Sequence, residues 1–269
     1  EINLIVFTGT GNTLLVAEQI QLELKKHRFK VNLIPMENFR NRKLNPEHTY
    51  GIGFPCAMHI TYPFVMDFIE NLEYRAKTNI FFFVTLGGTK CGVGTYLKRL
   101  YRKKPFNFCG YHDFQMPNNL FPNELAPNKY KQRIETTLQD VASFVEEIIY
   151  EDTHSFYTDL LSKSLIKMFE SAFMWNLLQR IYRMKTNSDK CSGCGLCVKL
   201  CPVSNIKFSE SANTYIHGDN CQVCERCIFY CPENAIELTR KNEKSLQYRG
   251  IEMKKMLKWI EHSQKINYK

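Results

Sequence analysis

Short apolar stretches alternate with longer segments of helical periodicity through the first 150 residues. The stretches are rich in Ile, Val, Phe and Tyr, which favour strands, and they predict strands at residues 2–7, 31–34, 50–54, 80–86 and about 106–115. Helical patterns lie between or after them at about 12–26, 62–75, 94–103 and 129–150, and residues 36–48 are predicted to be mostly loop. Because parallel strands need crossover connections, this alternation predicts an α/β domain whose parallel sheet is covered on both faces.

Two further segments have the pattern of amphipathic helices. Residues 155–184 are apolar at a period near four, which predicts one or two helices that join two halves of the chain. The apolar positions are Phe156, Leu160, Leu161, Leu165, Phe169, Phe173, Leu177 and Ile181. We expect this face to pack on neighbouring parts of the protein, and a helix lying on a membrane surface is the alternative. Residues 250–269 combine apolar side chains with five lysines and predict a docked or frayed helix.

Eight of the eleven cysteines belong to a run that is repeated after 30 residues. Both copies have the spacing C-x2-C-x2-C-x3-C-P. In the bacterial ferredoxin pattern with this spacing, the first three cysteines bind one 4Fe-4S cluster and the fourth binds the other cluster. The predicted ligands are Cys191, Cys194, Cys197 and Cys231 for one cluster, and Cys221, Cys224, Cys227 and Cys201 for the second.

Two other uses of these cysteines are possible. Structural zinc prefers four ligands from separated CxxC pairs, which would leave the third cysteine of each run without a role. Disulfides belong to oxidising compartments. The sequence opens with neither a basic leader nor a small-residue cleavage site, which predicts a cytoplasmic chain.

Residues 185–240 resemble the two-cluster ferredoxin family. The resemblance rests on all eight cysteines and on Pro202 and Pro232, which follow the last cysteine of each run. It implies a small α+β domain of pseudo-twofold symmetry, with clusters close enough for rapid one-electron transfer. Gly193 and Gly195 suit positions where the backbone approaches an inorganic core.

A loop rich in Thr and Gly separates the first predicted strand from the first predicted helix. Hydroxyl and backbone N–H groups at a helix N-terminus can bind a phosphate. The loop has neither the Lys of a Walker A motif nor the G-x-G-x-x-G of a dinucleotide site, and a glycine-rich turn with a Thr cap is the alternative. Its residues are Thr8, Gly9, Thr10, Gly11, Asn12 and Thr13.

This loop resembles the T/S-x-T-G-x-T phosphate loop of flavodoxins, which Thr8, Thr10, Gly11 and Thr13 match. The resemblance covers about residues 1–150 and implies a doubly wound, five-stranded parallel sheet of order 2-1-3-4-5 that binds FMN at its carboxyl edge. The flavin ring would lie between the loops that follow the third and fourth strands. The candidates there are Pro55, Cys56, Ala57, Met58, His59, Thr85, Leu86, Gly87 and Gly88. These loops lack the Trp or Tyr that flavodoxins place on the ring, so Met58 or His59 would cover a ring face.

The formal net charge of +9 changes this picture little. Of the excess, 5 charges come from the last 29 residues, which contain 8 basic and 3 acidic side chains. Two clusters and a flavin phosphate would each add roughly two negative charges and offset most of it. Because the basic residues are dispersed, no nucleic-acid partner is expected. No uncharged apolar run approaches the ~18 residues of a transmembrane helix, so no membrane-spanning segment is expected.

The chain is thus predicted to have four parts: a flavodoxin-like domain at 1–150, a helical linker at 151–184, a two-cluster ferredoxin domain at 185–240 and a basic helical tail at 241–269. The whole resembles flavodoxin-ferredoxin fusion proteins of anaerobic prokaryotes. That resemblance implies electron transfer between FMN and two 4Fe-4S clusters, with a redox partner protein or a small-molecule electron acceptor. A substrate could meet the flavin near His59 and Tyr62, but no catalytic residue is identified. The alternatives are a pure electron carrier, and an iron or redox sensor with an empty flavodoxin fold.

Overall fold

The computed structural model describes residues 1–39, 43–88, 91–118, 127–150, 162–238 and 249–262. Parts of the predicted linker and tail therefore lie outside the described residues, namely 151–161, 239–248 and 263–269. No helix in the described ranges has the length and the apolar composition needed to cross a bilayer.

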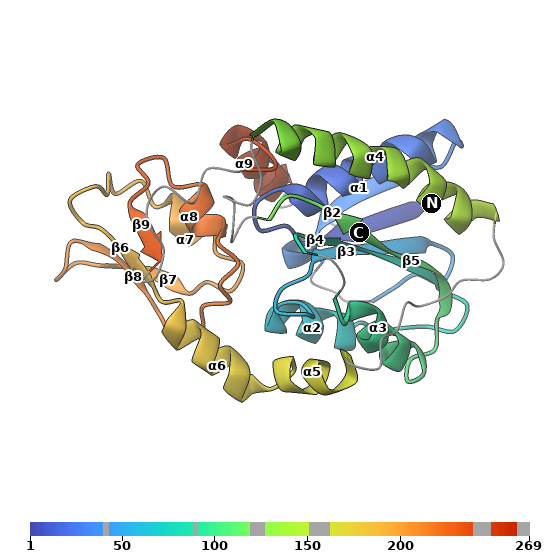
Figure 1. Ribbon diagram of the computed structural model, residues 1–269, viewed down its shortest axis with the longest axis horizontal. Coiled ribbons are helices and arrows are strands. Elements are labelled where there is room, and N and C mark those ends of the chain that lie inside the picture. Colours follow the sequence, from blue (N-terminus) through green and yellow to red (C-terminus); the bar gives the residue numbers. More distant parts are fainter. Residues whose placement is uncertain (40–42, 89–90, 119–126, 151–161, 239–248, 263–269) are drawn as a thin grey trace.

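The first half contains the predicted five-stranded sheet (Figure 1). All neighbouring strands are parallel, and their order is β2-β1-β3-β4-β5. This is the flavodoxin-like order, so the predicted fold class is confirmed. The strands are β1 (Ile2–Val6), β2 (Val31–Pro35), β3 (Thr49–Pro55), β4 (Asn79–Leu86) and β5 (Asn107–Gln115).

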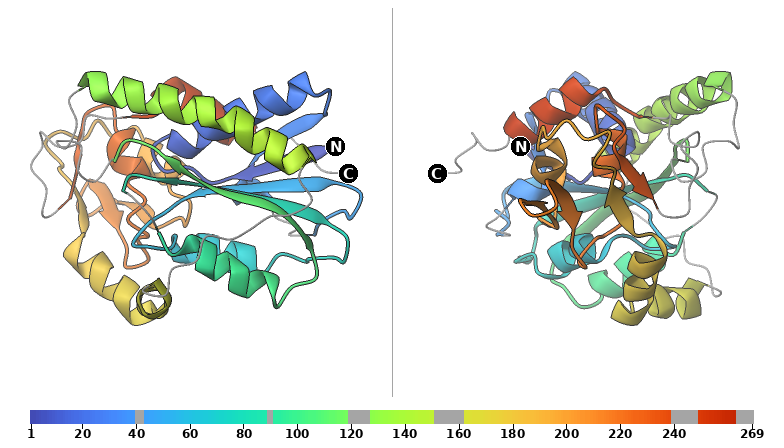
Figure 2. Two further views of the ribbon diagram at one scale, coloured as in Figure 1. Left: turned by 45° about the vertical axis from the view of Figure 1, so that its right-hand side comes forward. Right: turned by 90° about the vertical axis from the view of Figure 1, so that its left-hand side faces the viewer.

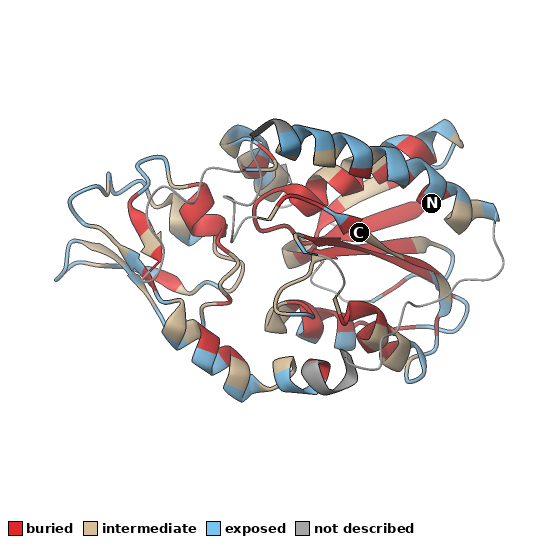
Figure 3. Ribbon diagram, viewed as in Figure 1, coloured by how far each residue is buried: buried red, intermediate tan, exposed pale blue. Residues whose placement is uncertain are grey.

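Helices cover both faces of this sheet (Figure 2). Helices α1 (Asn12–Lys26) and α4 (Pro127–Tyr150) lie on one face, and α2 (Pro63–Glu70) and α3 (Val93–Tyr101) lie on the other. A separate apolar core fills the space between the sheet and each helix pair. Figure 3 shows the buried residues concentrated on the strands and on the inner sides of α1, α2 and α3. The predicted loop contains one short 3-10 helix, η1 (Met36–Asn38).

Helix α2 is shorter than the predicted helix at 62–75, whose last turn is wrong. The helix ends at Glu70, and the Asn71 N–H and side-chain amide both donate to the Asp67 carbonyl oxygen. The chain then turns so that Leu72 and Tyr74 enter the core beside α2. The free energy gained by burying these two apolar side chains is larger than the helix propensity of the segment, so the chain turns toward the core and the helix does not continue.

The second half is a small α+β unit with an internal repeat. Strand β6 (Met184–Thr186) pairs with β9 (Ile236–Leu238), and β7 (Ile206–Ser209) pairs with β8 (Thr214–His217), both antiparallel. Two short helices, α7 (Leu196–Leu200) and α8 (Arg226–Phe229), lie at equivalent places in the two cysteine runs.

Three more helices lie outside these two units, two between them and one after the second. Helices α5 (Ser162–Phe169) and α6 (Ala172–Ile181) occupy the predicted linker, and α9 (Met253–His262) occupies the predicted tail. The predicted packing face of the linker is wrong in part: Phe173 and Leu177 are 74% and 41% exposed, whereas Trp175 and Leu178 are buried. The neighbours of α6 lie on the side of Trp175, which the apolar periodicity alone does not reveal.

The two halves share a third apolar core. It contains Leu14 of α1, Phe229 and Tyr230 of the second cysteine run, and Ile251 and Met256 next to or within α9. Because side chains from both halves fill one core, the ferredoxin-like unit is held against the end of the sheet where α1 begins.

Replacing Gly53 with Ala should destabilise the first half strongly. A Cβ at Gly53 would lie 2.1 Å from the Phe83 ring of the neighbouring strand. We expect overpacking to cost about 1–3 kcal/mol in the free energy of unfolding, measured by denaturant titration. Gly88→Ala is the control, since a Cβ there has no atom within 4 Å. Equal stability of the two variants would contradict this packing.

Candidate functional site

The Thr- and Gly-rich loop lies between β1 and the first turn of α1. Gly11 is the residue before α1 and has a φ of +108°, a conformation that favours glycine. Its N–H donates to the Thr8 hydroxyl oxygen at 3.0 Å, and the hydroxyls of Thr13 and Thr85 lie 2.8 Å apart. The first N–H groups of a helix have no partner within it, so this loop has the donors that a phosphate group needs.

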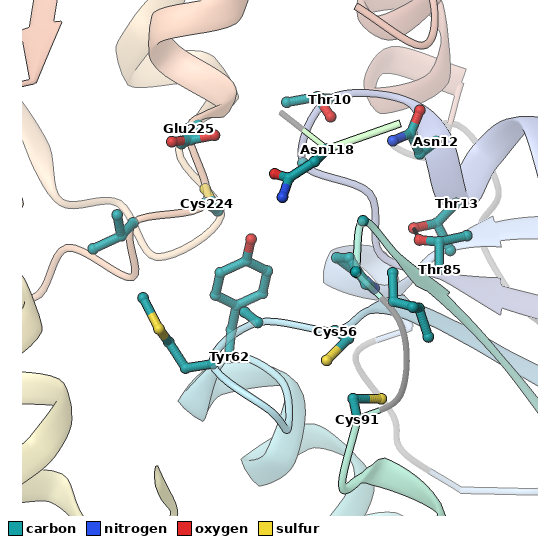
Figure 4. Close-up of a pocket in the computed structure, with 18 of the residues that line it drawn as sticks. Thr10, Asn12, Thr13, Cys56, Tyr62, Thr85, Cys91, Asn118, Cys224 and Glu225 are labelled. Carbon is teal, nitrogen blue, oxygen red and sulfur yellow. Dashed lines mark hydrogen bonds between the residues drawn. The ribbon is translucent and has the colours of Figure 1, made fainter. Parts of the chain in front are cut away.

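A cavity of about 270 Å³, open to solvent, lies beside this loop (Figure 4). The loops after β1, β3 and β4 all reach it, because parallel strands end at the same edge of a sheet. Of the fifteen residues predicted to bind the flavin, fourteen line the cavity and Gly11 does not. The fourteen are Thr8, Gly9, Thr10, Asn12, Thr13, Pro55, Cys56, Ala57, Met58, His59, Thr85, Leu86, Gly87 and Gly88.

The cavity is also lined by aromatic residues from outside the two predicted ring-binding loops. Trp175 of α6 is 3% exposed, and its ring centroid lies 6.1 Å from that of Tyr62. Its indole N–H donates to the Phe169 carbonyl oxygen at 2.8 Å, which fixes the ring. Tyr182 also lines the cavity. Sequence reasoning missed Trp175 and Tyr182, because the halves must be docked before α6 reaches the sheet edge.

Two cysteines lie at the floor of the same cavity. Cys56 and Cys91 both line it, and Cys91 Sγ lies 3.9 Å from an Asp113 carboxylate oxygen. The neighbouring Cys91 thiol and burial raise the pKa of the Cys56 thiol well above its usual value. The Cys56 side chain is therefore a protonated thiol at neutral pH. The ring of His59, another lining residue, is exposed and lies 5.6 Å from Phe169.

The eight cysteines of the repeat line two separate cavities, in the same two groups of four that the spacing predicts as cluster ligands. One cavity is lined by Cys191, Cys194, Cys197 and Cys231, and we call it the outer cavity. The other is lined by Cys201, Cys221, Cys224 and Cys227, and we call it the inner cavity. Within the described ranges, no three Cys, His, Asp or Glu side chains converge to hold a single metal ion.

The surroundings of these thiols suit an iron-sulfur cluster. Burial raises the pKa of the Cys197 thiol to about 11 and that of the Cys224 thiol to about 12. The thiolate forms of these side chains therefore need a bound metal cation to stabilise their negative charge. Backbone N–H groups already approach the sulfurs, because Asn205 donates to Cys201 Sγ and Ala235 donates to Cys231 Sγ, each at 3.2 Å. Such hydrogen bonds to sulfur tune the potential of a cluster.

The two runs use the same backbone turns with different residues. Gly193 and Gly195 have φ values of +73° and +70°, a conformation that favours glycine. The equivalent residues of the second run, Val223 and Glu225, have φ values of +53° and +60°. A β-branched Val in this region is strained by about 1–3 kcal/mol, and such strain persists only where the surroundings enforce it.

Cys224 lines both the inner cavity and the large cavity beside the Thr- and Gly-rich loop (Figure 4). Contact between the two loops is close, since a Cβ at Gly9 would lie 2.6 Å from the Cys224 carbonyl oxygen. Glu225 lines both cavities as well, so Cys224 and Glu225 form their shared boundary.

Residues 190–235 match the family model described as a 4Fe-4S dicluster domain. A sequence comparison with curated proteins gave no match. Among solved structures, the chain is similar to a flavodoxin from the domain Archaea (9% identity, TM-score 0.38, covering 55% of this chain and 97% of that one). It is also similar to flavodoxin 2 from Bacillus cereus (18%, 0.40, 55% and 99%) and to rubredoxin oxygen:oxidoreductase from Desulfovibrio gigas (12%, 0.35, 55% and 37%).

The chain thus joins a flavodoxin-like fold, shown by its sheet order, to a 4Fe-4S dicluster domain. The combination supports an electron-transfer protein. The two cysteine runs of the dicluster domain differ in exposure: Ser192, Gly193 and Cys194 are exposed, whereas Arg226 and Cys227 are buried against the flavodoxin-like half. The inner cavity therefore faces the large cavity, and the outer cavity lies toward solvent.

Proposed function

We propose that this chain binds FMN in the large cavity and one 4Fe-4S cluster in each cysteine-lined cavity, and that it transfers electrons among them. The observation that carries this proposal is that Cys224 lines both the large and the inner cavity. A bound flavin exchanges two electrons, and each cluster exchanges one. A direct boundary between the two sites suits exchange within one chain.

The residues around the large cavity would divide the work of holding the flavin. Thr8, Thr10 and Thr13 are buried at or just before the start of α1, and their hydroxyl groups would donate hydrogen bonds to the phosphate. The positive end of the helix dipole would also favour the phosphate charge. Trp175 and Tyr62 would exclude water from the ring with their apolar surfaces. Backbone N–H groups of Gly87 and Gly88 would approach the polar edge of the ring.

The cysteine sets would bind the clusters through four thiolates each, with the fourth ligand coming from the other run. The cluster held by Cys201, Cys221, Cys224 and Cys227 would exchange electrons with the flavin. The cluster held by Cys191, Cys194, Cys197 and Cys231 would exchange them with a redox partner protein, since Cys194 is exposed.

A second function has its own supporting observation. The large cavity has a volume of about 270 Å³, close to the lower end of the 300–1,000 Å³ range typical of small-molecule sites, and it is open to solvent, so a substrate could meet the flavin there. Anaerobic steady-state turnover with a panel of small acceptors distinguishes the two functions. Saturation by one acceptor supports an FMN-dependent oxidoreductase, and its absence across the panel supports a carrier.

The composition of the anaerobically purified chain tests the proposal. We expect about eight irons, eight sulfides and one FMN per chain, because each of the two predicted clusters contains four irons and four sulfides. About two zinc ions per chain would contradict the cluster assignment. Eight irons without flavin binding, even after incubation with FMN, would favour a sensor with an empty flavodoxin fold.

A further inference from the structure

Arg226 lies between two predicted ligands of the inner cavity and reaches into the flavodoxin-like half. It is 2% exposed. Its Nε and Nη2 groups donate to the Thr8 carbonyl oxygen at 3.1 and 2.6 Å, and Nη1 donates to the Leu200 carbonyl oxygen at 3.2 Å. Nη1 also lies 2.6 Å from a Glu37 carboxylate oxygen, and the guanidinium carbon lies 4.8 Å from the Phe7 ring centroid.

A buried charge is stable only where its surroundings satisfy it. The partners of Arg226 come from three parts of the chain. Thr8 belongs to the Thr- and Gly-rich loop, which we call the phosphate loop from here on, Glu37 belongs to η1, and Leu200 directly precedes Cys201. Arg226 thus connects the phosphate loop to both segments that supply thiols to the inner cavity. Breaking one side of this connection leaves some N–H groups of a buried cation without a partner, which is costly.

The same contacts orient the phosphate loop. A trans peptide is planar, so holding the Thr8 carbonyl also fixes the direction of the Gly9 N–H. The Thr10 carbonyl is held in the same way, by the Tyr230 hydroxyl at 3.0 Å and the Gly250 N–H at 2.9 Å. Both carbonyls are therefore held by groups from the second half of the chain.

The first cysteine run offers no equivalent contact, because Leu196 stands at the position of Arg226 in the repeat. We therefore expect the inner cluster, but not the outer one, to affect the phosphate loop.

We propose that Arg226 is a positioning residue of the flavin-phosphate loop, and that it couples FMN binding to occupancy of the inner cavity. This rests on the proposed function. Coupling between two binding free energies is reciprocal, so FMN should bind more tightly when the inner cluster is present, and that cluster should be retained against higher chelator concentrations when FMN is bound. Couplings of this kind typically amount to about 5- to 150-fold in affinity. The outer cluster should have no such effect.

The dissociation constant of FMN in the full chain tests the coupling, using matched variants from the repeat. Cys221→Ser removes a ligand of the inner cavity that does not line the large one, and Cys191→Ser is the equivalent change in the outer cavity. Iron analysis verifies which cluster each variant retains. We expect Cys221→Ser to weaken FMN binding at least about tenfold and Cys191→Ser to change it less than about twofold. Equal changes in the two variants would overturn the coupling.

Arg226→Leu, which copies the first run, tests the positioning residue itself. The iron retained at equilibrium is measured over a series of chelator concentrations with and without FMN, so that the ratio of the two midpoint concentrations reports the coupling. FMN should raise the midpoint for the inner cluster of the wild type at least about fivefold, and Arg226→Leu should bring the ratio close to one. A variant that loses iron at lower chelator concentrations but keeps the wild-type ratio would show a structural role only and overturn the proposal. Failure of the wild type to bind FMN would instead contradict the proposed function.

Discussion

Cys224→Ser should slow electron exchange between the flavin and the dicluster domain by at least about 10- to 100-fold, because even a change in a residue that only supports a metal ligand typically costs that much, and Cys224 is itself a predicted ligand. Cys224 lines both cavities, so its replacement changes the inner cluster and the boundary with the flavin at once. The rate is measured by rapid mixing, following flavin and cluster absorbance after anaerobic reduction. FMN and iron contents are measured on the same sample.

Cys194→Ser is the matched control, because it stands at the equivalent position of the first run and is exposed. It should leave exchange between the flavin and the inner cluster unchanged within about twofold, and should slow delivery of electrons to an external acceptor protein instead. If both variants slowed exchange with the flavin equally, the inner cavity would have no special relation to the flavin site.

Gly9→Ala should weaken FMN binding by about tenfold or more. The added Cβ would lie 2.6 Å from the Cys224 carbonyl oxygen, so the phosphate loop or the cysteine loop must move. Overpacking of this kind costs about 1–3 kcal/mol, and tenfold in affinity corresponds to about 1.4 kcal/mol. Fluorescence titration with FMN gives the dissociation constant, and thermal unfolding of the flavin-free chain shows whether the fold is retained. Wild-type affinity in a folded variant would mean that the two loops are not in firm contact.

Most of the first half could be predicted from the sequence, because its elements follow local patterns. The helix predicted at 12–26 has the bounds of α1, since its apolar periodicity begins directly after a glycine that ends the preceding loop. The run of aromatic residues at 81–83 is buried on both sides of the central sheet, as a parallel strand requires. The predicted division of the cysteines between two cavities likewise follows from their spacing.

The parts of the site that depend on docking of the two halves could not be predicted. Arg226 stands in the sequence as one charged residue among many, and its burial follows from contacts with Thr8 and Glu37 far away in the chain. The sequence likewise does not indicate that Trp175 and Tyr182 line the large cavity, because they reach it only when the two halves are docked. Periodicity reports which side of a helix is apolar, but not which neighbour will cover it, as exposed Phe173 illustrates.

The central claim is that electrons move between the flavin and the inner cluster within one chain. Flash photolysis tests it most directly, with a light-activated donor delivering a single electron to the anaerobic full-length chain while flavin and cluster absorbance are followed. We predict that flavin and cluster absorbance then change together in a first-order step whose rate does not depend on protein concentration. A rate that rises in proportion to protein concentration would show transfer between separate molecules and would contradict the account.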